Sequence, residues 1–223
     1  MAAVIGAPAD AALRHLASWG LVGGPTEPID LSGVDGLALL ADQHRVTSVV
    51  LAALDDGAAT GVPDELIDDL ADRHLRLLQQ SLMAEADLVF VARLFQDAGI
   101  EFRVLKGLAT AHLDHPDPAL RLTSDVDVLV RRGQLDAASE VLGPHVDWDQ
   151  SDPDRSAKWV QRYGKDRTLK LRGGSWIDLH QMRAHGWWGL SFDHDQLFDN
   201  GETYELARVP MTALNAEHRL VHA

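Results

Sequence analysis

The chain has 223 residues, a formal net charge of −14 and no cysteine. The length suits one large domain or two small ones, and the lack of cysteine excludes disulfides, zinc–thiolate sites and thiol catalysis. The negative charge disfavours non-specific binding to DNA or to anionic membranes. No apolar run reaches the roughly 18 residues that a membrane span needs. The first ten residues lack the basic region of a secretory signal, so we expect a cytoplasmic protein.

The first part of the chain, residues 1–98, is predicted to be a helical N-terminal region. Proline and acids at residues 63–65 are typical of a helix first turn, because the helix dipole favours them there. An apolar stripe follows through Leu70, Met83 and Phe90 to Gly99, which indicates one long helix. The shorter amphipathic helices are expected at residues 11–19, 35–45 and 47–54.

From residue 99 the pattern changes to short strands alternating with helices, which predicts an α/β core over residues 99–223. The helix that begins at Asn215 stops at Ala223, which suggests a core truncated at its C-terminus. The predicted strands are 100–105, 124–130, 167–172, 176–180 and 204–209, and the other predicted helices are 107–113 and 134–142.

Two aspartates, Asp125 and Asp127, lie on the predicted strand 124–130. Residues two apart in a strand point to the same face, so their carboxylates project together and repel. A cation between them relieves the repulsion, and oxygen ligands favour Mg²⁺ or Mn²⁺. If strand 176–180 is a neighbour, Asp178 converges with them, and three carboxylates suit a two-metal site. The alternative interpretation is a solvated acidic strand face.

A phosphate-binding turn is predicted at Lys106 and Gly107, between strand 100–105 and helix 107–113. A glycine at this position lets backbone N–H groups approach a phosphate, and the helix N-terminus favours negative charge. Lys106 adds a positive charge at the same place. A strand, a Lys-Gly turn, a helix and a strand with Asp-x-Asp form a rarer combination than any one part, which favours the metal-site interpretation.

Residues 155–172 form a basic island, with seven Lys or Arg and one acid, Asp166. Lys170 and Arg172 are expected to share one face of strand 167–172, just before the strand of Asp178. We hypothesise that they bind NTP phosphates or an anionic acceptor such as RNA. The alternative is a solvated face that offsets the acidic remainder. The other basic residues of the island at helical spacing are Arg155, Lys158, Arg162 and Lys165.

Two residues near the acids have two interpretations each. Arg121, four residues before Asp125, either contacts phosphate or pairs with Asp125 or Asp127. His180 shares a strand face with Asp178, so it is either a partner of a metal ligand or a histidine satisfied within its strand.

In these features the chain resembles the nucleotidyltransferase-fold superfamily (DNA polymerase beta-like), and most closely the uncharacterised bacterial nucleotidyltransferase family. The resemblance covers about residues 85–220. It rests on Val-Leu-Lys-Gly at 104–107, Arg121 with Ser-Asp-Val-Asp-Val-Leu-Val at 124–130, Ile-Asp-Leu-His at 177–180, and residues 209–218. The resemblance implies a mixed sheet flanked by helices and Mg²⁺-dependent transfer of a nucleoside monophosphate from an NTP.

The resemblance also implies roles for single residues. Asp125, Asp127 and Asp178 become the catalytic, metal-binding carboxylates, and Lys106 with Gly107 cradles the triphosphate. Leu108 departs from the superfamily, which usually has a second small residue after the glycine. The full set of expected nucleotide-binding residues is Lys106, Gly107, Arg121, Ser124, Lys170 and Arg172.

We therefore expect a nucleotidyltransferase in which an acceptor hydroxyl attacks the α-phosphate of an NTP such as ATP. The expected partners are the NTP and a small-molecule acceptor, with no membrane and no DNA. One alternative is a toxin-type nucleotidyltransferase that acts on RNA or protein. Another is a catalytically silent domain that binds a nucleotide or a partner.

Overall fold

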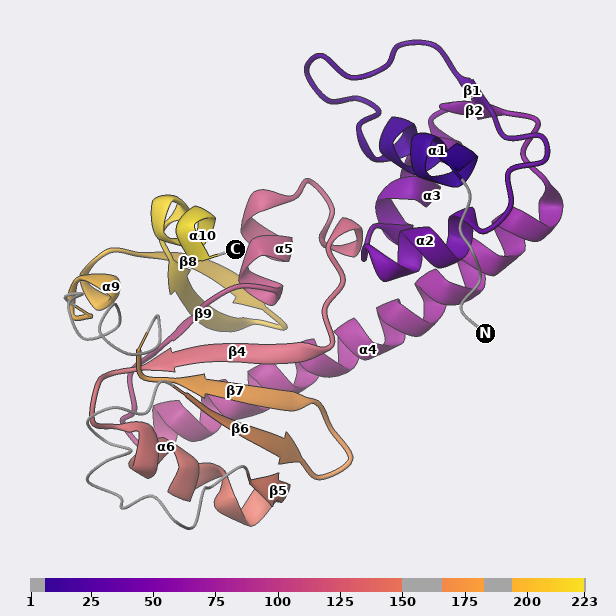
Figure 1. Ribbon diagram of the computed structural model, residues 1–223. Helices are drawn as coiled ribbons and strands as arrows, with labels where there is room; N and C mark the ends of the chain where they lie inside the picture. The colour runs from indigo at the N-terminus through magenta and orange to yellow at the C-terminus, as the bar shows by residue number, and fades with distance from the viewer. Residues whose placement is uncertain (1–6, 150–165, 183–193, 223) are drawn as a thin grey trace. The chain divides into compact units, whose positions relative to one another are not determined.

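A computed structural model describes residues 7–149, 166–182 and 194–222 of the chain (Figure 1). The chain forms two compact units, one of residues 1–79 with 119–121 and one of residues 80–118 with 122–223. The long helix α4 (Asp64–Asp97) contributes residues to both units. It ends at Asp97, close to residue 99, where the sequence predicts the change from helices to short strands. No helix in the described residues is long and apolar enough to cross a membrane.

The N-terminal unit is mainly helical, as the sequence predicts. A tight turn separates α2 from α3, and two very short strands, β1 and β2, pair in parallel within the unit. Leu16, Leu37, Val50 and Leu70 are fully inaccessible to solvent, or nearly so, and form its core. The elements are α1 (Ala7–Ala17), β1 (Ile29–Asp30), α2 (Leu37–Gln43), α3 (Thr47–Asp55), β2 (Ala59–Thr60) and the start of α4.

The C-terminal unit is built on a seven-stranded sheet in the order β5-β6-β7-β4-β3-β9-β8. The pairs β4–β7 and β3–β9 are parallel and the others antiparallel, so the expected mixed sheet is confirmed. The strands are β3 (Phe102–Val104), β4 (Asp125–Val130), β5 (Val146–Asp149), β6 (Asp166–Leu171), β7 (Trp176–His180), β8 (Gly201–Leu206) and β9 (Val209–Leu214). The helices are α5 (Leu108–Asp114), α6 (Leu135–Leu142), α9 (Gln196–Asp199) and α10 (Ala216–His222), with 3₁₀ turns η1 (Pro118–Leu120) and η2 (Gly143–His145).

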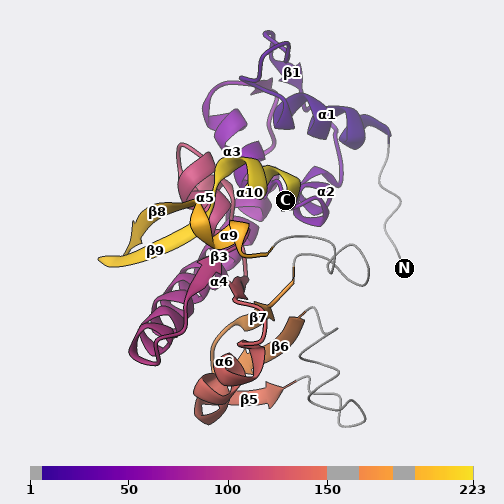
Figure 2. The ribbon, with the colours of Figure 1, turned by 90° about the vertical axis from the view of Figure 1, so that its left-hand side faces the viewer.

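The apolar face of the sheet packs on α4 and α6 (Figures 1 and 2). Alternation along β4 turns Val126, Val128 and Val130 into this core, where each is at most 1% exposed. The main partners from the two helices are Leu88, Val91, Phe95, Leu135 and Leu142. With one face of the sheet buried in this way, the alternate residues of β4, β6 and β7 are directed to the other face.

Three details differ from the sequence predictions. The predicted strand 204–209 is wrong, because Ala207 and Arg208 adopt φ of 47° and 64° and form a two-residue turn between β8 and β9. The predicted stripe of α4 is wrong at Met83 and Phe90, which are 45% and 37% exposed. Strands β1, β2 and β5, strand β9 beyond Val209, and helix α9 are not predicted by the sequence.

Candidate active site

The site is organised by the parallel pairing of β4 with β7 near the centre of the sheet. The register places Asp127 opposite Asp178, Asp125 opposite Trp176, and Leu129 opposite His180. Residues opposite each other on paired strands point to the same side of the sheet. The two acidic strands are therefore neighbours, which was the condition for Asp178 to lie near Asp127, and their acids share the face away from the apolar core.

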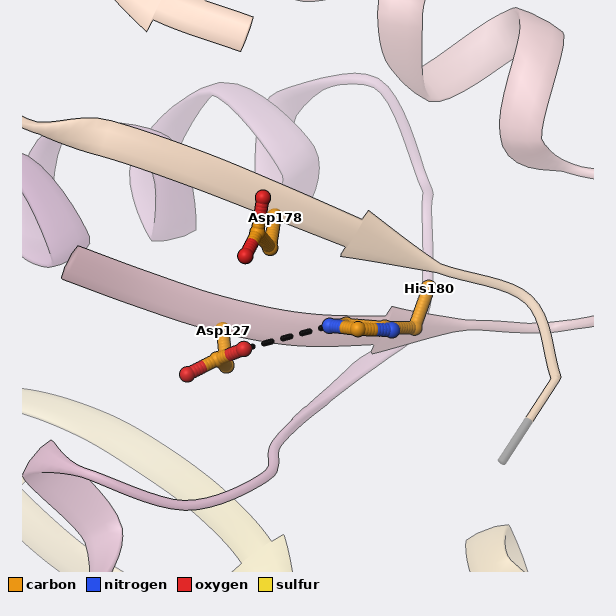
Figure 3. A group of neighbouring side chains, drawn as sticks. All are labelled: Asp127, Asp178 and His180. Carbon is orange, nitrogen blue, oxygen red and sulfur yellow. Dashed lines mark hydrogen bonds and ion pairs between the residues drawn. The ribbon is translucent and has the colours of Figure 1, made fainter. Parts of the chain in front are cut away.

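Asp127, Asp178 and His180 each offer a ligand atom, and these atoms lie within 4.8 Å of one another (Figure 3). Asp127 is 3% exposed and His180 is 4% exposed, whereas Asp178 is half-buried. Within the described ranges, this is the one group of three or more such residues close enough to share a metal ion. Asp178 is therefore the member of the cluster that is most accessible to solvent.

Each acid of the cluster is held by a neighbouring side chain. His180 Nε2 lies 3.1 Å from Asp127 Oδ1, and Lys106 Nζ lies 3.5 Å from the same oxygen. The hydroxyl of Thr168 on β6 donates to Asp178 Oδ1 at 2.6 Å. His180 therefore directly contacts a predicted metal ligand. Thr168 was missed, because its pairing with Asp178 depends on strand register, which the sequence does not reveal.

The cluster concentrates negative charge that a cation would neutralise. Carboxylate oxygens of Asp127 and Asp178 lie within 4.8 Å of each other, and two negative charges at that distance or closer repel by roughly 3 kcal/mol or more at an effective dielectric constant near 20. Lys106 offsets part of this, but its side chain is 43% exposed and so is well solvated. Carboxylate oxygens are the preferred ligands of Mg²⁺ and Mn²⁺, and an imidazole beside them either binds the ion or orients a ligand. The residues present therefore fit a divalent metal.

Asp125 is placed differently from its partner in the Asp-x-Asp pair. Within the part of the chain that the structure describes, it is not a member of the close group. It is half-buried, and its Oδ1 accepts a hydrogen bond of 2.7 Å from the hydroxyl of Thr123. Two residues along a strand correspond to roughly 7 Å, so Asp125 faces the same side one side-chain spacing away from Asp127.

The remaining predicted nucleotide-binding residues divide into two sets. Ser124 and Lys170 line a common pocket of about 320 Å³ beside the acids. Arg172 does not share the face of Lys170, because β6 ends at Leu171, and its guanidinium lies 3.2 Å from Asp147. Arg121 is half-buried in the bend after η1 and groups with the N-terminal unit. The other basic residues of the island, Arg155, Lys158, Arg162 and Lys165, lie outside the described residues.

Comparison with known proteins supplies the family. Residues 32–223 match the sequence profile of a family described as uncharacterised nucleotidyltransferase. The chain belongs to this family. Membership indicates a nucleotidyl-transfer function and confirms the resemblance seen in the sequence. No curated protein matches the chain.

Among solved structures, the chain is similar to an antigenic nucleotidyltransferase-like protein from Paracoccidioides brasiliensis. The two share 16% sequence identity with a TM-score of 0.42, over 63% of this chain and 64% of that protein. The similarity thus spans less than two thirds of that protein.

The match to the nucleotidyltransferase family takes in both compact units. It begins at residue 32, so it includes α2, α3 and all of α4 as well as the sheet and the acidic cluster. The family match therefore covers most of the helical N-terminal region as well as the sheet.

The predicted phosphate turn lies directly beside the acids of the cluster. Gly107 joins β3 to α5 with φ 55° and ψ −100°, a conformation that side-chain-bearing residues rarely adopt. A Cβ at this position would lie 3.0 Å from Thr123 Oγ1, the hydroxyl that donates to Asp125. Gly107 thus permits both the turn and the close approach of Thr123.

We expect Gly107→Ala to lower the free energy of unfolding by about 1–3 kcal/mol, the cost of a residue held in a sparsely populated backbone region. The matched control is Gly143→Ala, because Gly143 has helical angles (φ −47°, ψ −45°) and no atom lies within 4 Å of the position that an added Cβ would take. Urea unfolding of both variants checks the prediction. Equal stability of the two variants would contradict the role given to Gly107.

Proposed function

We propose that this chain transfers a nucleoside monophosphate from an NTP to a hydroxyl group of a small-molecule acceptor. One observation carries the proposal: Asp127 lies opposite Asp178 across the parallel strands β4 and β7, in a group with His180 whose ligand atoms are within 4.8 Å. Paired acids on a polar sheet face, in a member of a nucleotidyltransferase family, suit Mg²⁺- or Mn²⁺-dependent transfer.

The metal-binding residues we propose are Asp125, Asp127 and Asp178. A divalent cation bound there would neutralise the NTP phosphates and lower the pKa of the acceptor hydroxyl. His180 and Thr168 hold the oxygens of Asp127 and Asp178 in place.

The phosphate-binding residues we propose are led by Lys106 and Gly107. Lys106 lies between buried Asp127 and solvent, so it can contact a phosphate without leaving the carboxylate. Ser124 and Lys170 face the adjoining pocket and are proposed to bind the rest of the nucleotide. Arg121 and Arg172 were expected here too. We assign Arg172 to its ion pair with Asp147, and the nucleotide contact of Arg121 stays a prediction.

The reaction balances without any further reagent. The acceptor oxygen attacks the α-phosphorus, the bond from that phosphorus to the oxygen bridging the β-phosphate breaks, and pyrophosphate leaves with its electron pair. The acceptor proton passes to a carboxylate of the cluster or to water. The strongly negative chain favours a small acceptor over a polyanion such as RNA.

Transfer of label from α-labelled ATP, CTP, GTP and UTP tests the proposal. The protein is incubated with each NTP and with a metabolite extract, total RNA or total protein, in Mg²⁺, in Mn²⁺ or in EDTA. We expect label in the small-molecule fraction with either metal and none in EDTA. Label on RNA or protein alone would replace the proposed acceptor class, and no labelled product in any fraction would contradict nucleotidyl transfer.

A further inference from the structure

An aromatic and cationic surface continues the polar sheet face beyond the acids. We call Trp148, Lys170 and Trp176 the tryptophan shelf. Trp148 and Trp176 are 47% and 43% exposed, with ring centroids 5.4 Å apart and planes at 84°. Lys170 Nζ lies 5.1 Å from the centroid of the Trp176 ring. Two exposed tryptophans beside an ammonium group mark a surface suited to a ligand that is both aromatic and anionic.

The shelf adjoins the acids through strand register. Trp176 lies opposite Asp125 on β4 and opposite Lys170 on β6. It precedes Asp178 by two residues on the same strand face, a spacing of roughly 7 Å. A ligand whose phosphates reach the acidic cluster therefore has its next group over the shelf.

A pocket beside the shelf offers contacts of several kinds. Its volume is about 320 Å³, at the lower end of the roughly 300–1,000 Å³ of small-molecule sites. Trp176 and the flexible thioether of Met83 provide apolar surface, Gln80 and Ser124 provide hydrogen-bonding groups, and Lys170 provides positive charge. A flat ring with polar edges, attached to phosphates, matches these groups.

We propose that Trp176 stacks on the nucleobase of the NTP while Lys170 contacts its phosphates. This inference rests on the proposed function, because it places the same nucleotide at the same site. Stacking on an aromatic side chain tolerates every base, since all bases have a π-face. The shelf therefore binds purine and pyrimidine nucleotides alike, and it distinguishes a nucleotide from a bare polyphosphate.

Calorimetric titration with ATP and with inorganic tripolyphosphate, both in Mg²⁺ and without acceptor, tests the shelf. We expect Trp176→Ala to weaken ATP binding by about 5- to 150-fold, the range that stacking of one base contributes, and to leave tripolyphosphate binding unchanged. Trp176→Phe keeps an aromatic face and should retain most of the ATP affinity. The matched control is Phe90→Ala, which removes a partly exposed aromatic side chain from α4 and should change neither affinity.

The two ligands separate stacking from damage to the fold, because tripolyphosphate binding by Trp176→Ala reports an intact phosphate site. If Trp176→Ala weakens the binding of both ligands equally, or does not weaken ATP binding, the proposed role of the tryptophan shelf is wrong. The labelling experiment on the unsubstituted protein decides the proposed function separately. If the unsubstituted protein transfers label but Trp176→Ala binds ATP normally, only the role of the shelf is contradicted. If Trp176→Ala loses affinity for ATP alone but no label is transferred, the shelf is supported and nucleotidyl transfer is contradicted.

Discussion

Replacement of Asp127 by asparagine is expected to reduce metal-dependent nucleotidyl transfer by at least about a hundredfold, because a metal ligand that stabilises transition-state charge contributes several kcal/mol. Asp127 is the most buried acid of the cluster, and both His180 and Lys106 contact its Oδ1. An amide at this position keeps the shape of the side chain but lacks the charge that binds a cation. The initial rate of label transfer from an α-labelled NTP measures the effect.

Two further variants distinguish the loss of a metal ligand from the loss of any negative charge on the sheet. Asp178→Asn should reduce transfer to a similar degree, because Asp178 faces Asp127 across the strand pair. Asp147→Asn removes a more than half-exposed acid of β5 that pairs with Arg172, and it should transfer label at the rate of the unsubstituted protein. Full activity in Asp127→Asn, or equal losses in Asp127→Asn and Asp147→Asn, would contradict the proposed metal site.

The second large effect is on stability, and we expect it from Arg219→Met. Arg219 on α10 is 3% exposed and binds Asp114 through two hydrogen bonds of 2.9 and 2.5 Å. It also donates to Glu202 at 2.9 Å and to the Leu214 carbonyl at 2.5 Å. It thereby joins α10 to α5 and to the β8–β9 hairpin. The side chains of Asp114 and Glu202 are 36% and 44% exposed, so water can solvate both acids when Arg219 is lost. Urea unfolding should therefore show a decrease of about 1–3 kcal/mol, the range for lost hydrogen bonds to charged groups.

The matched control for this prediction is Arg172→Met. The pair of Arg172 with Asp147 has side chains 68% and 54% exposed, and exposed pairs contribute about 1 kcal/mol or less. Similar stabilities of Arg219→Met and Arg172→Met would contradict the structural role of Arg219.

The dependence of stability on pH provides a second test of the ion pairs of Arg219. The hydrogen bond from Arg219 holds the pKa of Asp114 below its ordinary value. A carboxyl group whose pKa is lowered by folding contributes stability above its unfolded pKa, about 3.9 for Asp, and that contribution is lost as the pH falls through the lowered folded value. In Arg219→Met the free energy of unfolding should therefore lose the decrease at low pH that the protonation of Asp114 causes.

The sequence indicated which segments carry the acids of the candidate site, but not how those segments pair. Alternation on two valine-rich segments indicated two acidic strands, and the structure pairs those strands in parallel. The register that puts Asp127 rather than Asp125 opposite Asp178 depends on contacts between distant segments, so no local pattern reveals it. The hydrogen bond from Thr168 to Asp178 depends on strand register in the same way, so the sequence does not predict it.

The fold was harder to predict where turns lack their usual residues. The β8–β9 turn is formed by Ala207 and Arg208 at positive φ, where glycine or asparagine is typical. Without that signal the pattern of residues 204–209 predicts one continuous strand. On α4, exposed Met83 and Phe90 follow a helical spacing as well as the buried Leu88 and Phe95 do, so periodicity alone did not identify the face that packs on the sheet.

Diffraction from crystals soaked with Mn²⁺ and a non-hydrolysable NTP analogue tests the central claim most directly. The account predicts an anomalous scattering peak within bonding distance of carboxylate oxygens of Asp127 and Asp178, with the triphosphate of the analogue beside it. Nucleotide bound without a peak between these two acids, or a peak only elsewhere on the chain, would contradict the assignment of the acidic pair as the metal-binding centre of the proposed transfer reaction.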